Sequence, residues 1–98
     1  MPICHIVTLS FTADLPEEVM PQLEQRLTEF VDGRAGIVSY TCGIDLGLHE
    51  SNADFAISAT FDSTTALEAY TSHPQHQAII TEFARPYLVT RSAAQFEL

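Results

Sequence analysis

Lysine is absent from this sequence, and arginine is scarce. The chain has four basic residues against 13 Asp and Glu, which gives a formal net charge of −9. Nucleic-acid-binding proteins neutralise phosphates with clustered cations, and anionic membrane surfaces attract basic segments in the same way. The four cations here are scattered, at Arg26, Arg34, Arg85 and Arg91. We therefore expect no nucleic-acid partner and no membrane partner, and we interpret the acidity as favouring solubility.

Cysteine and long hydrophobic runs are also scarce. Cys4 and Cys42 lack the C-x-x-C spacing of redox pairs and zinc sites, so we expect two buried thiols. No apolar run approaches the roughly 18 residues of a membrane span. Residues 1–11 lack the basic region and cleavage site of a signal peptide. We expect a cytoplasmic protein in which residues 1–98 form one domain.

The first half of the chain predicts a strand, a helix and a second strand. Alternation over residues 3–11 places His5 in the middle of an otherwise apolar strand face. Pro16 and Gly33 mark the start and the end of a helix, and its expected apolar stripe is Met20, Leu23, Leu27 and Val31. Residues 37–48 predict the second strand, in which Gly43 indicates a bulge or a close backbone approach.

The second half predicts a strand, two short helices and a last strand. The strand covers residues 55–61, and a helix capped by Asp62 or Ser63 covers residues 62–70. Another helix runs from Pro74 to about Phe83, Pro86 ends it, and residues 87–98 form the last strand.

The resulting order, β-α-β-β-α-β, predicts an α+β, ferredoxin-like fold with a four-stranded antiparallel sheet and helices on one face. The opposite sheet face, which includes Ile6, is left open. Because a small domain seldom leaves such a face uncovered, we expect a homodimer formed through it.

Three polar side chains are predicted to converge between the sheet and the helices. His76 lies on one stripe with Ile79, Ile80 and Phe83 at helical spacing. His5 lies on the inner strand face, and Tyr70 projects from the buried side of its helix. A single histidine on an apolar face is usually a core residue with a satisfied hydrogen bond. Several polar groups in one apolar gap are typical of a small-molecule site, so both interpretations remain open.

The other two histidines are weaker candidates. His73 precedes a proline at a helix entrance, where capping or exposure is expected, and His49 lies beside Glu50 in a polar loop. A metal site built from His73 and His76 lacks an adjacent carboxylate, so we expect no metal and no cofactor.

The strand "HIVTLSF", the segment "FAISATFDSTTALEAY" and the following "HPQH" resemble the stress-responsive dimeric α/β-barrel (Dabb) family from His5 to about Glu97. The resemblance implies a ferredoxin-like protomer whose sheet pairs face to face with that of a second copy to form a barrel. In one member, olivetolic acid cyclase, a Tyr and a His form a general acid/base pair that falls on Tyr70 and His76, and a pocket His falls on His5. A further pocket His of that cyclase is replaced by Phe55.

The functional expectation is therefore a protein that binds a small hydrophobic carbonyl compound, with cofactor-independent acid/base chemistry at Tyr70 and His76. A buried, neutral His76 takes a proton next to a carbonyl, and the Tyr70 hydroxyl donates to the developing oxyanion. The expected ligand-contacting residues are His5, Phe55, Ile57, Ile80 and Phe83. Two alternatives remain: a non-catalytic stress-response or structural protein, and a cofactor-free monooxygenase.

Overall fold

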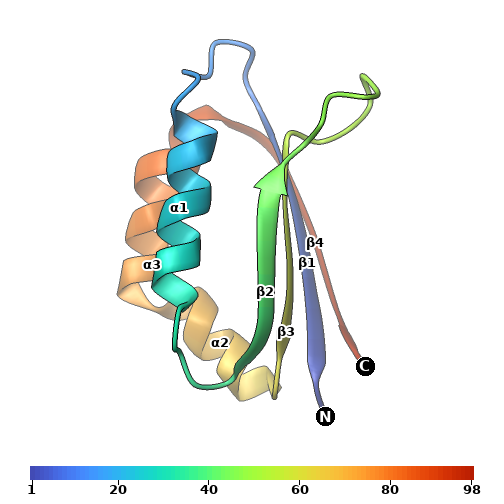
Figure 1. The fold of residues 1–98 in the computed structure, drawn as a ribbon, viewed down its shortest axis with the longest axis vertical. Helices are drawn as coiled ribbons and strands as arrows, with labels where there is room; N and C mark the ends of the chain where they lie inside the picture. Colours follow the sequence, from blue (N-terminus) through green and yellow to red (C-terminus); the bar gives the residue numbers. More distant parts are fainter.

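All helices of the chain lie on one face of a four-stranded antiparallel sheet (Figure 1). The computed structural model describes residues 1–98. The elements in chain order are β1 (Ile3–Phe11), α1 (Val19–Val31), β2 (Ile37–Ile44), β3 (Phe55–Phe61), α2 (Thr64–Ser72), α3 (Pro74–Ile79), the π-helical turn η1 (Ile80–Ala84), the 3-10 turn η2 (Arg85–Tyr87) and β4 (Leu88–Glu97). This arrangement confirms the predicted ferredoxin-like fold. The sheet of one chain is open and does not close into a barrel.

The sheet order β2-β3-β1-β4 sets which residues face the helices. Val7 of β1 pairs with Ile57 of β3, and His5 pairs with Ala59, so the odd-numbered residues of both strands point to the helix layer. The alternating burial along β1 confirms the predicted strand, with His5 buried among apolar neighbours. Cys4 and Cys42 are free thiols, and their strands, β1 and β2, are separated by β3.

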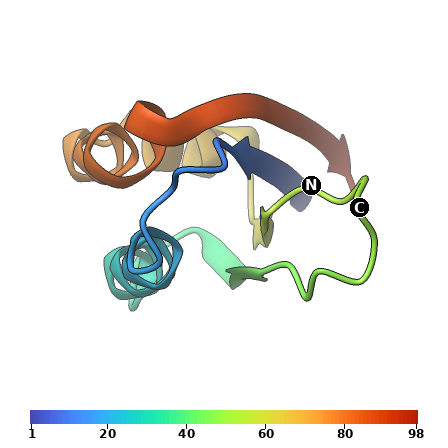
Figure 2. The ribbon, with the colours of Figure 1, turned by 90° about the horizontal axis from the view of Figure 1, so that it is seen from above.

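Helix α1 is rotated slightly from the predicted orientation. It begins at Val19, and Pro16 lies in the preceding turn, where its carbonyl accepts a hydrogen bond from the Val19 N–H at 3.1 Å. Its buried residues are Val19, Leu23, Leu27 and Phe30. Met20 and Val31, which were expected in the stripe, lie at its border and are half-buried, because each is one position further around the helix. This face packs beside α3 and η1, as Figure 2 shows.

Strand β2 is shorter than predicted. It ends at Ile44, which pairs with Phe55, the first residue of β3, so the chain beyond it has no partner strand. Residues 45–54 instead form a loop that projects beyond the sheet, closed by a hydrogen bond from the Asp45 N–H to the Asp54 carbonyl at 2.8 Å. The predicted bulge at Gly43 is wrong: Gly43 pairs regularly with Ala56, and the register shift lies between Ile37 and Ser39.

The last helical segment continues past the predicted end. Alpha-helical geometry stops at Ile79, the chain widens into the π-helical turn η1 as far as Ala84, and Pro86 lies within η2. No helix of the chain is both long enough and apolar enough to cross a membrane.

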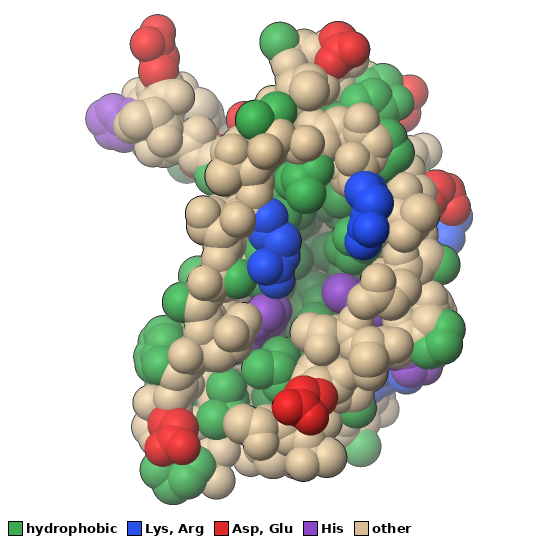
Figure 3. All heavy atoms as spheres, turned by 180° about the vertical axis from the view of Figure 1, so that it is seen from behind, with side chains coloured by type: hydrophobic (Ala, Val, Ile, Leu, Met, Phe, Trp, Pro, Cys, Tyr) green, Lys and Arg blue, Asp and Glu red, His purple; other side chains and the backbone are tan.

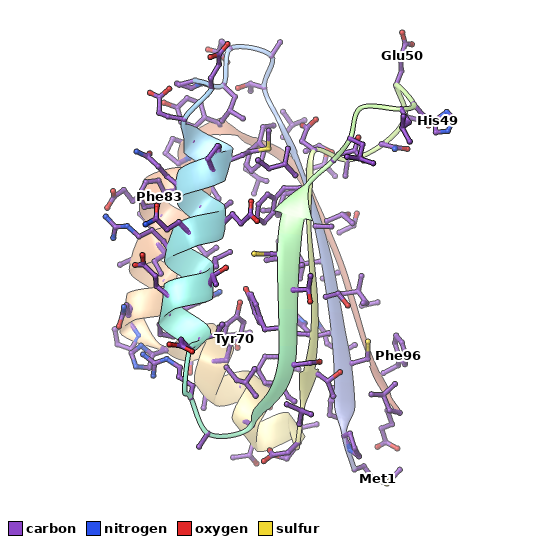
Figure 4. All side chains as sticks on the ribbon, viewed as in Figure 1. Met1, His49, Glu50, Tyr70, Phe83 and Phe96 are labelled. Atoms are coloured by element: carbon purple, nitrogen blue, oxygen red, sulfur yellow. The ribbon has the colours of Figure 1, made fainter.

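The strand residues on the outer face of the sheet include no charged side chain. Strand pairing places the alternate residues of the four strands on this face: Cys4, Ile6, Thr8, Ser10, Ser39, Thr41, Gly43, Ala56, Ser58, Thr60, Thr90, Ser92, Ala94 and Phe96. Phe96 points away from the helix layer in Figure 4 and is 52% exposed. In a chain of net charge −9, this uncharged face is distinct from the rest of the surface.

Candidate active site

A cavity of about 420 Å³ lies between strands β1 and β4 and the α2–η2 segment. His5, Tyr70 and His76 line it together with Ile57 and Ile80. The space-filling view shows a hollow with histidine side chains within it and arginine side chains beside it (Figure 3). The volume falls in the range of small-molecule pockets, roughly 300–1,000 Å³.

Five of the seven residues that we predicted as catalytic or ligand-contacting therefore line this one cavity. The other two lie elsewhere. Phe55 is 1% exposed within the core, and Phe83 packs under the guanidinium of Arg26, 5.4 Å from its ring centroid. The π-helical turn explains why Phe83 does not line the cavity. The wider winding of this turn rotates Phe83 away from the face that carries His76 and toward α1.

Neither of the remaining histidines lines the cavity. His73 caps α3, since its Nδ1 accepts a hydrogen bond from the Gln75 N–H at 3.0 Å, which confirms the expected capping role. His49 and Glu50 lie at the tip of the 45–54 loop, far from Tyr70 (Figure 4). No three His, Cys, Asp or Glu side chains are grouped closely enough to hold a metal ion.

Tyr70 occupies the centre of a group of aromatic rings. Its ring centroid lies 4.4 Å from that of His76 and 6.2 Å from that of His5. Its hydroxyl is 2.8 Å from the hydroxyl of Tyr40 on β2. Burial raises the pKa of Tyr70 to about 12, while the hydrogen bond with Tyr40 opposes this rise. Burial raises the pKa of Tyr40 well above its usual range, and the neighbouring Tyr70 raises it further through its charge and the shared hydrogen bond, so Tyr70 is the more acidic phenol of the pair.

His76 is held with one nitrogen protonated and the other free. Its Nδ1 lies 3.2 Å from the Thr71 carbonyl, which only accepts hydrogen bonds, so Nδ1 carries the proton. Nε2 therefore keeps its lone pair in the neutral ring. Burial lowers the pKa of His76, the bond to Thr71 opposes this, and the positive charge of Arg91 lowers the pKa further. The arrangement is that of a neutral imidazole base.

His5 has the opposite tautomer. The side-chain amide of Gln95 donates to Nδ1 of His5 at 2.9 Å, which leaves the ring proton on Nε2. Burial lowers the pKa of His5, with a further contribution from Arg91, so the ring stays neutral. Every buried side-chain nitrogen or oxygen in the structure has a hydrogen-bond partner. The Nε2–H of His5 has no hydrogen-bond partner and is therefore not fully buried, so it is the donor that His5 offers to the cavity it lines.

Among the residues of this site that sequence reasoning missed are Tyr40, Gln95, Arg85 and Arg91. Alternation along the last strand would have placed Arg91 and Gln95 on one face, and only the register opposite Leu9 and His5 shows that it is the inner one. The inward orientation of Tyr40 depends on the register shift in β2. Simple alternation from Ile37 would have placed Tyr40 on the outer face.

A second depression, of about 410 Å³, lies on the outer face of the sheet at the base of the 45–54 loop. Small uncharged residues such as Thr8, Thr41 and Ser58 line it, and Asp45 is its one charged residue. It lacks the grouped titratable side chains of the inner cavity.

The fold and cavity define a small α+β protein of the ferredoxin-like class with a cavity of ligand size under its helices. The chain belongs to the stress responsive A/B barrel domain (Dabb) family, whose sequence pattern matches residues 3–98. No curated protein matches the chain in sequence.

Solved structures share the fold along almost the whole chain. A dimeric ferredoxin-like protein of unknown function from Thermobifida fusca is 32% identical, with a TM-score of 0.90 over 100% of this chain and 92% of that one. A dimeric protein of unknown function from Bacteroides fragilis is 20% identical, with a TM-score of 0.84 over 99% and 96% of the two chains. The hydroxynitrile lyase of Passiflora edulis is 17% identical, with a TM-score of 0.79 over 97% and 91%. The last two show the fold alone.

Proposed function

We propose that this chain is a cofactor-independent enzyme that binds a small hydrophobic carbonyl compound in the inner cavity and moves a proton with His76 and Tyr70. The observation that carries the proposal is the neutral His76, whose ring centroid lies 4.4 Å from that of Tyr70, with the rings tilted by 49°, in the wall of a ligand-sized cavity. The hydroxynitrile lyase among the structural neighbours supports it only to the extent that an enzyme is built on this fold.

The proposed step is proton abstraction next to a carbonyl group. His76 Nε2 takes the proton, the electron pair of the C–H bond becomes the enolate, and the Tyr70 hydroxyl donates a hydrogen bond to the enolate oxygen. Because the Tyr70 proton is then directed to the enolate, Tyr70 accepts the hydrogen bond that it shares with the Tyr40 hydroxyl at 2.8 Å, and this bond strengthens Tyr70 as a donor. In an aldol cyclisation, the enolate carbon would bond to a second carbonyl carbon, whose oxygen would take the proton back from His76.

A second candidate is a non-catalytic stress-response protein. The observation that favours it is the internal hydrogen bond of each polar ring: His5 with Gln95, Tyr70 with Tyr40, and His76 with Thr71. These bonds satisfy the buried groups without any ligand. They involve only the Nδ1 atom of each histidine, so His76 Nε2 and the His5 Nε2–H have no partner within the chain. We favour the enzyme because these two groups can still accept from and donate to a ligand.

Deuterium exchange of benzoylacetone, a hydrophobic 1,3-diketone, tests the proposal. Followed by NMR in D2O, exchange above the buffer rate should fall about 10²-fold or more in His76→Gln, because the base is removed. His49→Gln, at the loop tip, should exchange like the wild type. Equal rates in both variants, with native circular dichroism, would refute catalysis by His76. Oxygen uptake in the same assay would favour the monooxygenase instead.

We also propose that two copies of the chain pair through the outer sheet face. That face is uncharged along all four strands, and the loop beside it exposes Leu46 and Leu48. The Thermobifida fusca and Bacteroides fragilis structures are both described as dimeric, which supports the pairing.

A further inference from the structure

The four arginines of the chain divide into two pairs. Arg34 lies over the ring of Phe30 at 3.9 Å and donates to the Phe30 carbonyl, and Arg26 lies over Phe83. These two pack on the helix layer. The other two, Arg85 in η2 and Arg91 on β4, line the inner cavity from its helix side and its sheet side. Half of the basic residues of an acidic chain therefore border one hollow, as Figure 3 shows.

The charge of this pair is not neutralised within the cavity. No Asp or Glu lines the hollow, and its remaining walls are apolar or neutral. Arg85 and Arg91 are exposed, so both guanidinium groups lie at the mouth. The positive charge of Arg91 also acts on the interior of the cavity, because it contributes to lowering the pKa of both His5 and His76. A guanidinium pairs strongly with a carboxylate or phosphate, and the apolar wall beside it strengthens that attraction.

We propose that the natural ligand of the cavity is an anion, with a carboxylate or phosphate group held at the mouth by Arg85 and Arg91 and an apolar carbonyl-bearing body lying on Ile57 and Ile80. This inference rests on the proposed function and narrows its substrate to a negatively charged class. The anion fixes the orientation of the molecule, because only one end matches the cationic mouth. The carbonyl-bearing body then lies in the cavity that His76 also lines.

Isothermal titration with three related probes tests the inference. The probes are 4-oxo-4-phenylbutanoate, its neutral methyl ester, and the phosphonate that replaces its carboxylate. The wild type should bind the carboxylate or the phosphonate about tenfold or more tighter than the ester, which corresponds to one charged hydrogen-bonded pair. The tighter of the two anions identifies the acid class of the substrate. Anion affinity should also fall as NaCl is raised.

Matched variants assign the effect to the mouth of the cavity. Arg91→Met and Arg85→Met should each lower affinity for the preferred anion about tenfold more than affinity for the ester. Arg26→Met removes the same charge from the Phe83 contact and should leave the anion preference intact. Equal binding of anion and ester by the wild type, or equal losses in Arg91→Met and Arg26→Met, would overturn the inference.

The two proposals fail separately. If benzoylacetone exchange depends on His76 but no anion is preferred, the proposed function stands and the anionic substrate is refuted. If the anion binds through Arg91 and no exchange depends on His76, the anion site stands and the catalytic role is refuted.

Discussion

His5 and His76 present opposite hydrogen-bonding groups to one cavity. The difference comes from their partners: an amide N–H of Gln95 occupies His5 Nδ1, whereas the Thr71 carbonyl occupies His76 Nδ1. A donor and an acceptor therefore arise from the same residue type without any change of charge. Both nitrogens of a protonated ring are donors, so protonation of His76 would remove its acceptor at Nε2, and protonation of His5 would break the hydrogen bond from Gln95 at Nδ1.

This argument predicts a pH-dependent stability. Burial lowers the pKa of both His5 and His76 below the ordinary 6.5. Above pH 6.5 both folded and unfolded rings are neutral, so they contribute no pH dependence. Below it the unfolded chain binds protons that the folded chain resists, so the free energy of unfolding falls until the folded pKa is reached.

Urea denaturation at pH 7.5 and pH 5.0 measures the effect. The wild type should lose more stability across this interval than His76→Gln, which lacks one of the two titrating rings. His49→Gln, altered in an exposed loop, should lose as much as the wild type. If all three proteins lose the same free energy of unfolding between pH 7.5 and pH 5.0, then the pKa of His76 is not lowered in the folded chain.

The convergence of Tyr70, His5 and His76 could be predicted from the sequence, because each residue interrupts an apolar periodicity that has to face the core. Phe83 shared the His76 stripe on an ideal helix, and only the π-helical turn removes it from the cavity. Arg91 and Gln95 could not be placed, since an exposed edge strand carries no burial pattern to fix its register.

At the scale of the elements, the break at His73-Pro74 sets the geometry of the site. The backbone of His73 is extended, with φ −61° and ψ 131°, as expected before a proline. His73 ends α2 by donating its N–H to the Tyr70 carbonyl and begins α3 by accepting from the Gln75 N–H. The two short helices thereby meet at an angle that brings the ring of His76 against that of Tyr70, with 4.4 Å between their centroids. The H-P-x-H pattern therefore has a structural reason that is independent of any chemistry.

A pair of substitutions isolates this capping role. His73→Ala removes the acceptor for the Gln75 N–H and should lower the free energy of unfolding by about 1 kcal/mol. His73→Asn keeps a short acceptor at the cap and should recover most of that loss, although both variants lose the ring contact with Phe30. Chemical denaturation measures both values. Equal destabilisation by Ala and Asn would assign the stabilisation to the ring contact instead of the cap.

At the scale of the molecule, strand pairing separates two surfaces of different character. Two arginines and two histidines line the inner cavity, whereas the strand residues on the outer sheet face carry no charge. The sequence predicted that this face is open, because β1 alternates and all helices were expected on one side. Its uncharged character emerged only with the register of β2 and β4, whose residues are exposed on both sides and show no clear alternation.

The proposed homodimer makes this face sensitive to a single charge. Ser58 lies near the centre of the outer face, opposite Ile6 on the neighbouring strand, and is exposed in one chain. Ser58→Glu leaves the folded protomer unstrained but would bury an unpaired carboxylate between two copies, which costs several kcal/mol. Light scattering at micromolar concentration should therefore give a dimer for the wild type and the mass of one 10.8 kDa chain for Ser58→Glu.

Gln22→Glu, which adds the same charge to the exposed side of α1, should remain dimeric. If Ser58→Glu stays dimeric, the two copies pair through a different surface, and the outer sheet face has another role.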